Sequence, residues 1–507
     1  MGDLEFLIVL LLGAAALVRL ADVAAIPYPI VLVVGGLLVG LVPGLPDATL
    51  PPEAVFLVFL PPLLHAAGFA ASPQELRAEK RALGWLAAGV VLLTMGAVAV
   101  VAHALVEGLS WPAAFVLGAV VAPTDPVSAA ATFTRIPVPR RVSLLVEGEA
   151  MINDGTALVA YRLAVAAAVS GTFSAGEAAA DFVVAALGGI AVGLAVGWVE
   201  VRVLHRQADR ALTIFLTVGA AYGAYILAEE AGVSGVLAAV VSGLYLGWFS
   251  HIAFDADTRL SALAFWQVLV FGLNAMLFIL LGLQFPGLVD EIRRDLSLGA
   301  LAGAALAVSA TVVAVRIAAQ FVPGAIPGAD WRERLVVGWS GMRGAISLAA
   351  ALSVPLSVSA RPQIVFLTFV VILVTLVGQG LTLPALLRAL RVEGPRPWSP
   401  DEAIARLEAA QAALDRLDQL EEEGIDEEQL RRLRELYRAR FRACVAAAGG
   451  QDGRPPPDMR RYGDLRRDLI GVERDTLLRM RNDGRLRQDT LRDIERDLDL
   501  EEARLRA

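Results

Sequence analysis

The stretch that decides the fold reads Glu147-Gly-Glu-Ala-Met-Ile-Asn-Asp-Gly155 and lies inside a long apolar run. Its carboxylates, Glu147, Glu149 and Asp154, fall within about two turns of a predicted helix. An ionisable group inside a membrane-spanning helix is costly and usually functional. Asp154 lies about 16 Å along the helix from the nearer end of the run, close to the middle of a bilayer. Because burial there disfavours the charged carboxylate, Asp154 could exchange a proton for a cation near neutral pH.

The composition of the whole chain is that of a polytopic membrane protein. Of 507 residues, 56% are hydrophobic and 19% are charged, and the mean hydropathy is +0.62. Soluble chains are usually about 45–50% apolar and about 25% charged, so a soluble enzyme and a disordered protein are excluded. The single cysteine, Cys444, excludes an internal disulfide. No basic run points to nucleic acid, so we expect no nucleic-acid partner. The membrane-protein composition and the buried acids favour a transporter, so we expect no enzymatic activity.

Charged residues are distributed unevenly and divide the chain into two parts. They are sparse in residues 1–392 and dense in residues 393–507, which predicts a transmembrane domain followed by a polar helical tail. Patterning in the tail predicts helices at 401–420, 427–445 and 462–505, with a break at 449–457. The tail could regulate the membrane domain, mediate dimerisation or be only a solvated appendage.

The transmembrane part contains about thirteen apolar runs long enough to cross a bilayer as helices. We therefore predict an all-α polytopic fold, and an odd number of spans is compatible with one span plus two inverted repeats, as in many transporters. The predicted spans are residues 4–20, 26–42, 53–71, 82–106, 111–133, 143–169, 180–201, 211–228, 233–249, 261–285, 299–321, 335–355 and 363–390.

Basic residues in the predicted loops indicate the orientation. The loops after the third, fifth, seventh and eleventh spans carry arginine, whereas most loops between them carry neither Arg nor Lys. Because cytoplasmic loops are enriched in Arg and Lys, we predict that the N-terminus is outside and the tail is cytoplasmic. We expect a multi-pass protein of the plasma membrane, surrounded by lipid.

The fifth predicted span is interrupted by Ala122-Pro-Thr-Asp-Pro126. Pro123 and Pro126 each remove a backbone donor and disfavour helix at the preceding residue, so the helix should break here. A break at membrane depth is tolerated only where protein buries it or where it lines a watery cavity. The freed carbonyls, the Thr124 hydroxyl and the Asp125 carboxylate would then suit a hard cation. Asp125 could equally cap the second half-helix, and the two roles are compatible.

Two arginines within apolar runs match these acids in depth. Arg316 and Glu149 lie at similar distances from the inner ends of their spans, so we predict a buried ion pair that fixes their geometry. Arg343, in the glycine-rich segment 338–344, matches Asp125 in the same way. We infer that Arg343 and Asp125 balance the dipole ends of two broken helices that cross. The alternative for Arg343 is a side chain that snorkels to the membrane surface.

These motifs resemble those of the monovalent cation:proton antiporters, in the electroneutral branch that contains bacterial NhaP-type proteins and animal sodium/hydrogen exchangers. The resemblance covers the membrane part and rests on residues 122–126, 147–155, 265–284 and 341–346, in this order. It implies a homodimer in which each chain has a dimerisation part and a mobile core, with the fifth and twelfth spans broken and crossed.

The resemblance also implies roles for individual residues. Asp154 would bind the proton or the metal ion, Na⁺ or K⁺, with Asn153, Thr124 and Asp125 in support. Glu149 and Arg316 would form a pair. Two departures leave the selectivity open and make K⁺ or Li⁺ alternatives to Na⁺. Ala150 stands where many relatives have Ser, and His65-Ala66 stand where relatives often have an aromatic residue and an acid.

The function that follows is secondary active exchange of Na⁺ for H⁺, by alternating access, for pH and sodium homeostasis. One carboxylate that binds either ion, but never both, predicts electroneutral one-for-one exchange, and no cofactor is expected beyond the transported ions.

A cation channel is a rival function, but the polar groups cluster at one depth with apolar runs on both sides. An intramembrane aspartic protease is another, but its Gly-x-Gly-Asp motif is missing from the predicted spans. His65 would most simply be a packed histidine, with a proton role as the alternative.

Overall fold

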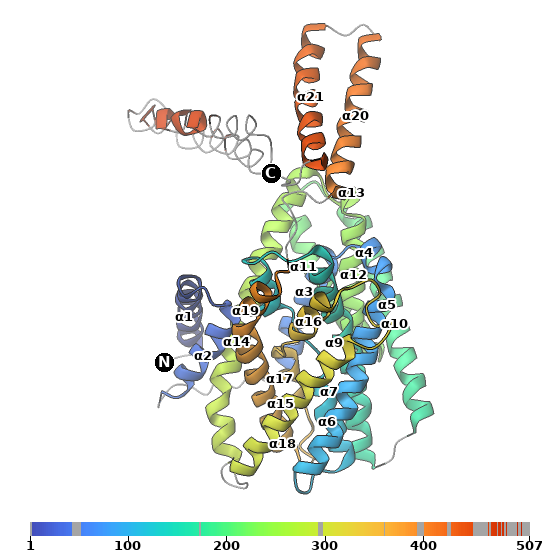
Figure 1. Ribbon diagram of the computed structural model, residues 1–507, viewed down its shortest axis with the longest axis vertical. Helices are drawn as coiled ribbons and strands as arrows, with labels where there is room; N and C mark the ends of the chain where they lie inside the picture. The colour runs from blue at the N-terminus through green and yellow to red at the C-terminus, as the bar shows by residue number, and fades with distance from the viewer. Residues whose placement is uncertain are drawn as a thin grey trace. The chain divides into compact units, whose positions relative to one another are not determined.

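The structure is a computed structural model that describes residues 3–42, 52–171, 174–292, 298–358, 360–392, 400–422, 427–449 and short pieces between 465 and 498. Every regular element in these residues is helical (Figure 1). The chain divides into two compact units, Met1–Gly394 and Pro395–Ala507.

The first unit contains the helices of the predicted transmembrane part. In chain order these are α1 (Asp3–Ala24), α2 (Tyr28–Gly40), α3 (Pro52–Ala70), α4 (Pro73–Ala78), α5 (Lys80–Gly84), the π-helical turn η1 (Trp85–Val90), α6 (Val91–Leu105), α7 (Trp111–Val121), α8 (Val127–Phe133), α9 (Arg140–Ser170), α10 (Ala175–Leu204), α11 (Arg210–Glu230), α12 (Gly235–Trp248), α13 (Ser250–Ala253), α14 (Ala256–Ile292), α15 (Leu298–Gln320), α16 (Trp331–Trp339), α17 (Ala345–Leu352), α18 (Arg361–Leu373), the π-helical turn η2 (Val374–Gln379) and α19 (Gly380–Leu390).

Each apolar run predicted from the sequence falls on a helix, on consecutive helices or on two half-helices. Within the described residues, seven helices are long and apolar enough to cross a membrane, and further apolar helices such as α2, α7 and α12 are shorter. The all-helical membrane fold is confirmed. The count of thirteen spans and the inverted repeat stay predictions.

The helices of the first unit form two groups that pack mainly among themselves. In the scaffold bundle (α1, α2, α3, α10, α11, α12 and α14), α2 packs along α14 and α3 packs along α12. In the core bundle (α6, α7, α9, α15, α16, α17 and α18), α7 packs against α6 and α9, and α15 packs against α6, α16 and α18. Glycine permits the closest approaches, since a Cβ on Gly36 would overlap the Ile279 carbonyl and a Cβ on Gly243 would overlap the His65 carbonyl.

Two spans of the core bundle are broken, at the places that the sequence predicts. Helix α7 ends at Val121 and α8 begins at Val127, and α16 ends at Trp339 before α17 begins at Ala345. The two irregular segments meet, because the backbone N–H of Asp125 donates to the carbonyl of Met342 at 2.8 Å. Prolines in the first break and glycines in the second explain why neither span continues as a helix.

The second unit contains two long helices, α20 (Pro400–Glu422) and α21 (Glu427–Gly449), close to the ranges that the tail pattern predicts. They pack side by side (Figure 1). Arg434 of α21 donates to Asp418 and to Glu421 of α20, at 2.7 Å each. The predicted break at 449–457 lies almost wholly outside the described residues, and so does most of the predicted helix at 462–505.

Candidate ion-binding site

A cavity of about 500 Å³ lies between the scaffold bundle and the core bundle. Helices α3 and α14 line it from one side, and α9, the first break and the start of α17 line it from the other. Along α9 the lining extends from Arg140 to Asp154. Asp125, Glu147 and Asp154 bring three carboxyl groups to a wall that is otherwise mostly apolar.

Asp154 combines burial with an unsatisfied oxygen. Only 6% of the residue is exposed. Its Oδ1 atom has no hydrogen-bond partner among the described residues. A buried carboxylate oxygen without a partner is unfavourable, and a proton or a cation would satisfy it. Because Asp154 also lines the cavity, such an ion has a route to it.

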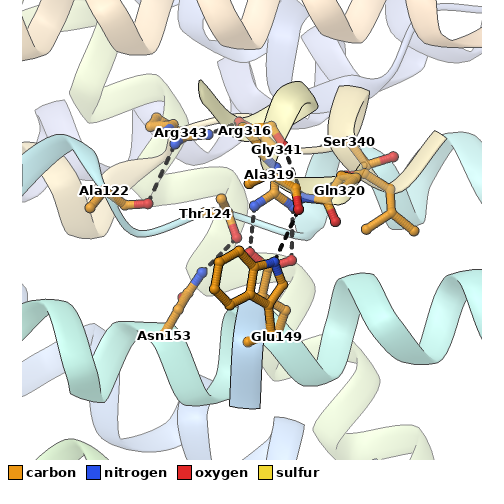
Figure 2. Close-up of polar contacts among 12 residues, drawn as sticks. Ala122, Thr124, Glu149, Asn153, Arg316, Ala319, Gln320, Ser340, Gly341 and Arg343 are labelled. Atoms are coloured by element: carbon orange, nitrogen blue, oxygen red, sulfur yellow. Dashed lines mark hydrogen bonds and ion pairs between the residues drawn. The ribbon is translucent and has the colours of Figure 1, made fainter. Parts of the chain in front are cut away.

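Asn153 joins α9 to the first broken span. Its side-chain amide donates from Nδ2 to the Thr124 hydroxyl at 2.8 Å (Figure 2). The Asn153 Oδ1 atom is buried and has no partner in the part of the chain that the structure describes. Thr124 itself is 5% exposed and lines the cavity. Thr124 and Asp154 therefore bring a hydroxyl and a carboxyl group to one cavity, and oxygen atoms are the ligands that hard cations prefer.

Glu149 and Arg316 form a fully buried ion pair, with each side chain 1% exposed. Arg316 Nη2 donates to Glu149 Oε2 at 2.8 Å, and Nη1 donates to Oε1 (Figure 2). Nη2 also donates to the Val337 carbonyl at 3.2 Å. A Cβ on Gly341 would overlap the guanidinium group, so the second break carries glycine where Arg316 passes it. The pair holds α9, α15 and α16 together.

Arg343 belongs to the second break, and its side chain lies against the C-terminal end of α7, the first half of the broken fifth span. Its Nε donates to the Val121 carbonyl at 2.8 Å. Its Nη2 donates to the Ala122 carbonyl at 3.4 Å (Figure 2). These carbonyls belong to the negative end of α7, where a positive charge is favourable. Arg343 is 1% exposed, so the snorkelling alternative does not apply. Its backbone N–H donates to the Thr375 hydroxyl at 3.1 Å, which fixes the break against η2.

Asp125 lies at the positive ends of the two half-helices that follow the breaks. Its Oδ1 atom accepts from the backbone N–H of Val127, at the start of α8, at 2.9 Å. A Cβ on Gly344, which directly precedes α17, would overlap the Asp125 carboxylate. Asp125 thus compensates helix N-termini while Arg343 compensates a helix C-terminus. Asp125 also lines the cavity, so a residue that caps a helix lies beside the space that an ion could enter.

The site residues predicted from the sequence therefore fall into two sets. Thr124, Asp125 and Asp154 line the cavity, with Pro123 and Pro126 beside them. The set behind this wall, which supports it, is Asn153, Glu149, Arg316 and Arg343. Ala150 also lines the cavity, so the position at which the resemblance led us to expect Ser faces the site.

Sequence reasoning missed part of the opposite wall and the start of α17. Gln267, on α14, and Ser347, in the first turn of α17, line the cavity. Ser347 directly follows the segment 341–346, which was a usable signal. Gln267 lies within the segment 265–284 on which the resemblance rests, so that segment was a usable signal as well. His65 is not in the cavity wall; it contacts Ser242 and Glu200 instead.

Comparisons with known proteins agree with this arrangement. A family model described as "Sodium/hydrogen exchanger, transmembrane" matches residues 6–389. An uncharacterized Na⁺/H⁺ exchanger of Mycobacterium tuberculosis is 36% identical, over 94% of this chain and 91% of that protein. The Na⁺/H⁺ antiporter ApNhaP of Aphanothece halophytica is 35% identical, over 82% of this chain and 80% of the relative.

Among solved structures, the sodium proton antiporter MjNhaP1 of Methanocaldococcus jannaschii, at pH 8, resembles this chain with a TM-score of 0.63. The match covers 76% of this chain and 98% of that protein, at 20% identity. At such an identity the similarity concerns the fold alone.

Proposed function

The chain belongs to the sodium/hydrogen exchanger family, and from this premise we propose that it exchanges Na⁺ for H⁺ across the plasma membrane, with Asp154 as the ion-carrying group. The observation that carries the proposal is the buried Oδ1 atom of Asp154, which has no partner in the described residues and belongs to a cavity wall. A carboxylate in this position gains most from binding either a proton or a cation.

Competition between the two ions for one carboxylate gives the exchange. When Na⁺ binds, the proton must leave, and when the proton returns, Na⁺ must leave. The residue before Asp154 is Asn153, which carries no charge, so one proton moves for each Na⁺ and no net charge crosses the membrane. Thr124, Asp125 and Asn153 would supply further oxygen ligands.

Alternating access requires that one group of helices moves against the other. We propose that the core bundle, which carries Asp154, moves against the scaffold bundle. The cavity reaches Arg140 at the start of α9, and the arginines of the loops assign this end to the cytoplasm. The structure would then represent an inward-facing state. Arg316 and Arg343 would keep the site intact while the core bundle moves.

K⁺ and Li⁺ stay as alternative substrates because Ala150 brings no oxygen to the cavity. We also propose a homodimer in the lipid bilayer, with the N-terminus outside and the tail in the cytoplasm. The protein would act as a transporter rather than an enzyme, without a cofactor, in pH and sodium homeostasis. The tail's function stays open between regulation, dimerisation and a solvated appendage.

The test is a flux assay with purified protein in proteoliposomes that contain a pH-sensitive dye. With an acidic interior, external Na⁺ should alkalinise the lumen, whereas choline should not. K⁺ and Li⁺, added in turn, give the selectivity. Clamping the membrane potential at different values should leave the initial rate unchanged. Absence of flux with every cation would contradict the proposal, and a voltage-dependent current would favour the channel.

A further inference from the structure

A second pair of ionisable side chains is buried within the scaffold bundle, away from the cavity. His65 of α3 is 0% exposed and Glu200 of α10 is 5% exposed. His65 Nε2 lies 3.7 Å from Glu200 Oε1. Neither residue belongs to the described cavity wall around Asp154. The transport mechanism proposed above does not use this pair.

Hydrogen-bond accounting favours one tautomer of His65. The Ser242 hydroxyl lies 2.9 Å from the Ala239 carbonyl, to which it donates. With its single hydrogen used there, Ser242 Oγ accepts from His65 Nδ1, which lies 3.0 Å away. In the tautomer assigned in this way His65 carries a hydrogen on Nδ1, and in the neutral ring Nε2 is a bare acceptor that faces Glu200.

A deprotonated Glu200 would also present only acceptors. Within the described residues, His65 Nε2 and both carboxyl oxygens of Glu200 have no hydrogen-bond partner, since the 3.7 Å between them is longer than a hydrogen bond. Two acceptors facing each other in a buried place are unfavourable, and a bare buried carboxylate is more so. One additional proton removes both penalties, either as a Glu200 carboxylic acid that donates to Nε2 or as an imidazolium that donates to the carboxylate.

We propose that His65 and Glu200 hold one shared proton and form a second protonation site, in the scaffold bundle and separate from Asp154. In the part of the chain that the structure describes, the side chains that contact His65 from α12 and α14, Ser242 and Trp266, carry no charge. Helix α12 contributes Ser242, and α14 contributes Trp266, whose ring centroid lies 5.4 Å from that of His65. Arg202, on the same helix as Glu200, lies over the Trp198 ring, 4.9 Å from its centroid.

Loss of the shared proton leaves a buried negative charge without compensation. The stabilisation is therefore present at low and neutral pH and is lost as the pH rises through the value at which the pair deprotonates. Trp266 connects the pair to transport, because its ring packs at a tilt against His65 and also lines the cavity. Its indole N–H donates to the Thr217 hydroxyl of α11 at 3.1 Å, which holds the ring in place. A change of charge at the pair thus reaches the cavity through one side chain.

The test compares Glu200→Gln with Glu200→Ala in purified full-length protein. The amide of Gln donates a permanent N–H to Nε2, so it imitates the protonated acid. We expect the melting temperature of the unsubstituted protein to fall by several degrees between neutral and strongly alkaline pH, and Glu200→Gln to lack that part of the fall. Glu200→Ala should be less stable than Glu200→Gln at neutral pH, because it leaves Nε2 unpaired.

The same titration in an Asp154→Asn background separates this proposal from the proposed function, since the alkaline transition should persist there. Nitrogen NMR of labelled histidine, assigned by His65→Gln, gives a readout independent of folding: the Nδ1 atom should be protonated at neutral pH. An Nδ1 without hydrogen would overturn the proposal. So would an alkaline transition that is identical in the unsubstituted protein and in Glu200→Gln.

Discussion

Glu149 and Asp154 are two acids on one helix, little more than one turn apart, and both are nearly buried. Glu149 gives both oxygens to Arg316. Asp154 keeps an oxygen without a partner in the described residues and lies in the cavity wall. The comparison teaches that depth in the membrane does not decide what a carboxylate does. A carboxylate that is paired with an arginine is not available to a transported ion. A carboxylate with an unsatisfied oxygen is available.

The largest expected effect comes from Asp154→Asn. The amide keeps the size of the side chain but cannot bind a proton and cannot neutralise a cation, so cation-dependent proton flux in proteoliposomes should be abolished. Thermal unfolding should change little, because no described contact depends on the carboxylate charge. Asp154→Glu, which retains a carboxyl group, should keep part of the flux. Normal exchange by Asp154→Asn would remove Asp154 from the mechanism.

The second largest expected effect is on stability, and it comes from Arg316, the partner of Glu149. Arg316→Ala should destabilise the fold by about 3–5 kcal/mol, because it leaves Glu149 charged and buried without a partner. Thermal unfolding of purified protein measures this loss, and flux assays should show a smaller change in the apparent cation affinity. Replacing both residues with apolar ones, as in Glu149→Leu/Arg316→Met, should recover much of the stability. An unchanged melting temperature in Arg316→Ala would mean that the pair does not stabilise the protein.

The position of the first break, the pairing of Glu149 and the unusual depth of Asp154 could all be predicted from the sequence. The prolines of the first break are incompatible with a continuous helix, so its position was predictable from the chain alone. Position along a span can be counted in residues, and for this reason the depth match of Glu149 with Arg316 pointed to a pair that the structure contains. The carboxyl group of Asp154 stood out because an acid at mid-membrane depth is unusual.

Lateral neighbours were less predictable, because rotation and packing of the helices set them. The sequence predicted that Arg343 and Asp125 balance the dipole ends of the two broken helices, but not that Arg343 binds the carbonyls of Val121 and Ala122 in particular. His65 and Glu200 lie on helices far apart in the chain, and no spacing connects them. Their contact depends on how α3 and α10 pack around α12, which the apolar pattern of these helices does not encode.

Arg343 allows a third and smaller test of the contrast between paired and unpaired groups. Arg343→Gln removes the charge at the C-terminal end of α7 and should cost about 2 kcal/mol of stability, the upper range for a charge at a helix end. Flux should fall without being abolished, because Asp154 stays intact. Arg343→Lys keeps the charge but loses the planar fork, so it should be intermediate in thermal unfolding. Equal melting temperatures for Arg343→Gln and the unsubstituted protein would contradict the helix-end role.

The smallest expected effect concerns Ala150, which lies one turn before Asp154 on α9, is 1% exposed and lines the cavity. Ala150→Ser adds a hydroxyl group to the cavity wall that Asp154 also lines. An additional ligand of about 0.5–1.5 kcal/mol would raise the apparent Na⁺ affinity by about twofold to tenfold in the dye assay. Ala160→Ser is the matched control, because Ala160 lies on the same helix but packs in an apolar cluster away from the cavity.

The serine at position 150 has a competing partner, since a helical Ser can donate to the carbonyl four residues earlier. If that bond holds the hydroxyl, the Na⁺ affinity will stay unchanged, and the ligands that distinguish Na⁺ from K⁺ must then come from the first break and Asn153. If the affinity rises for Na⁺ and Li⁺ but not for K⁺, the oxygen missing at Ala150 sets the selectivity. In that case Asp154 supplies the carboxylate that transport of any cation needs, and the side chain at position 150 determines which cation binds.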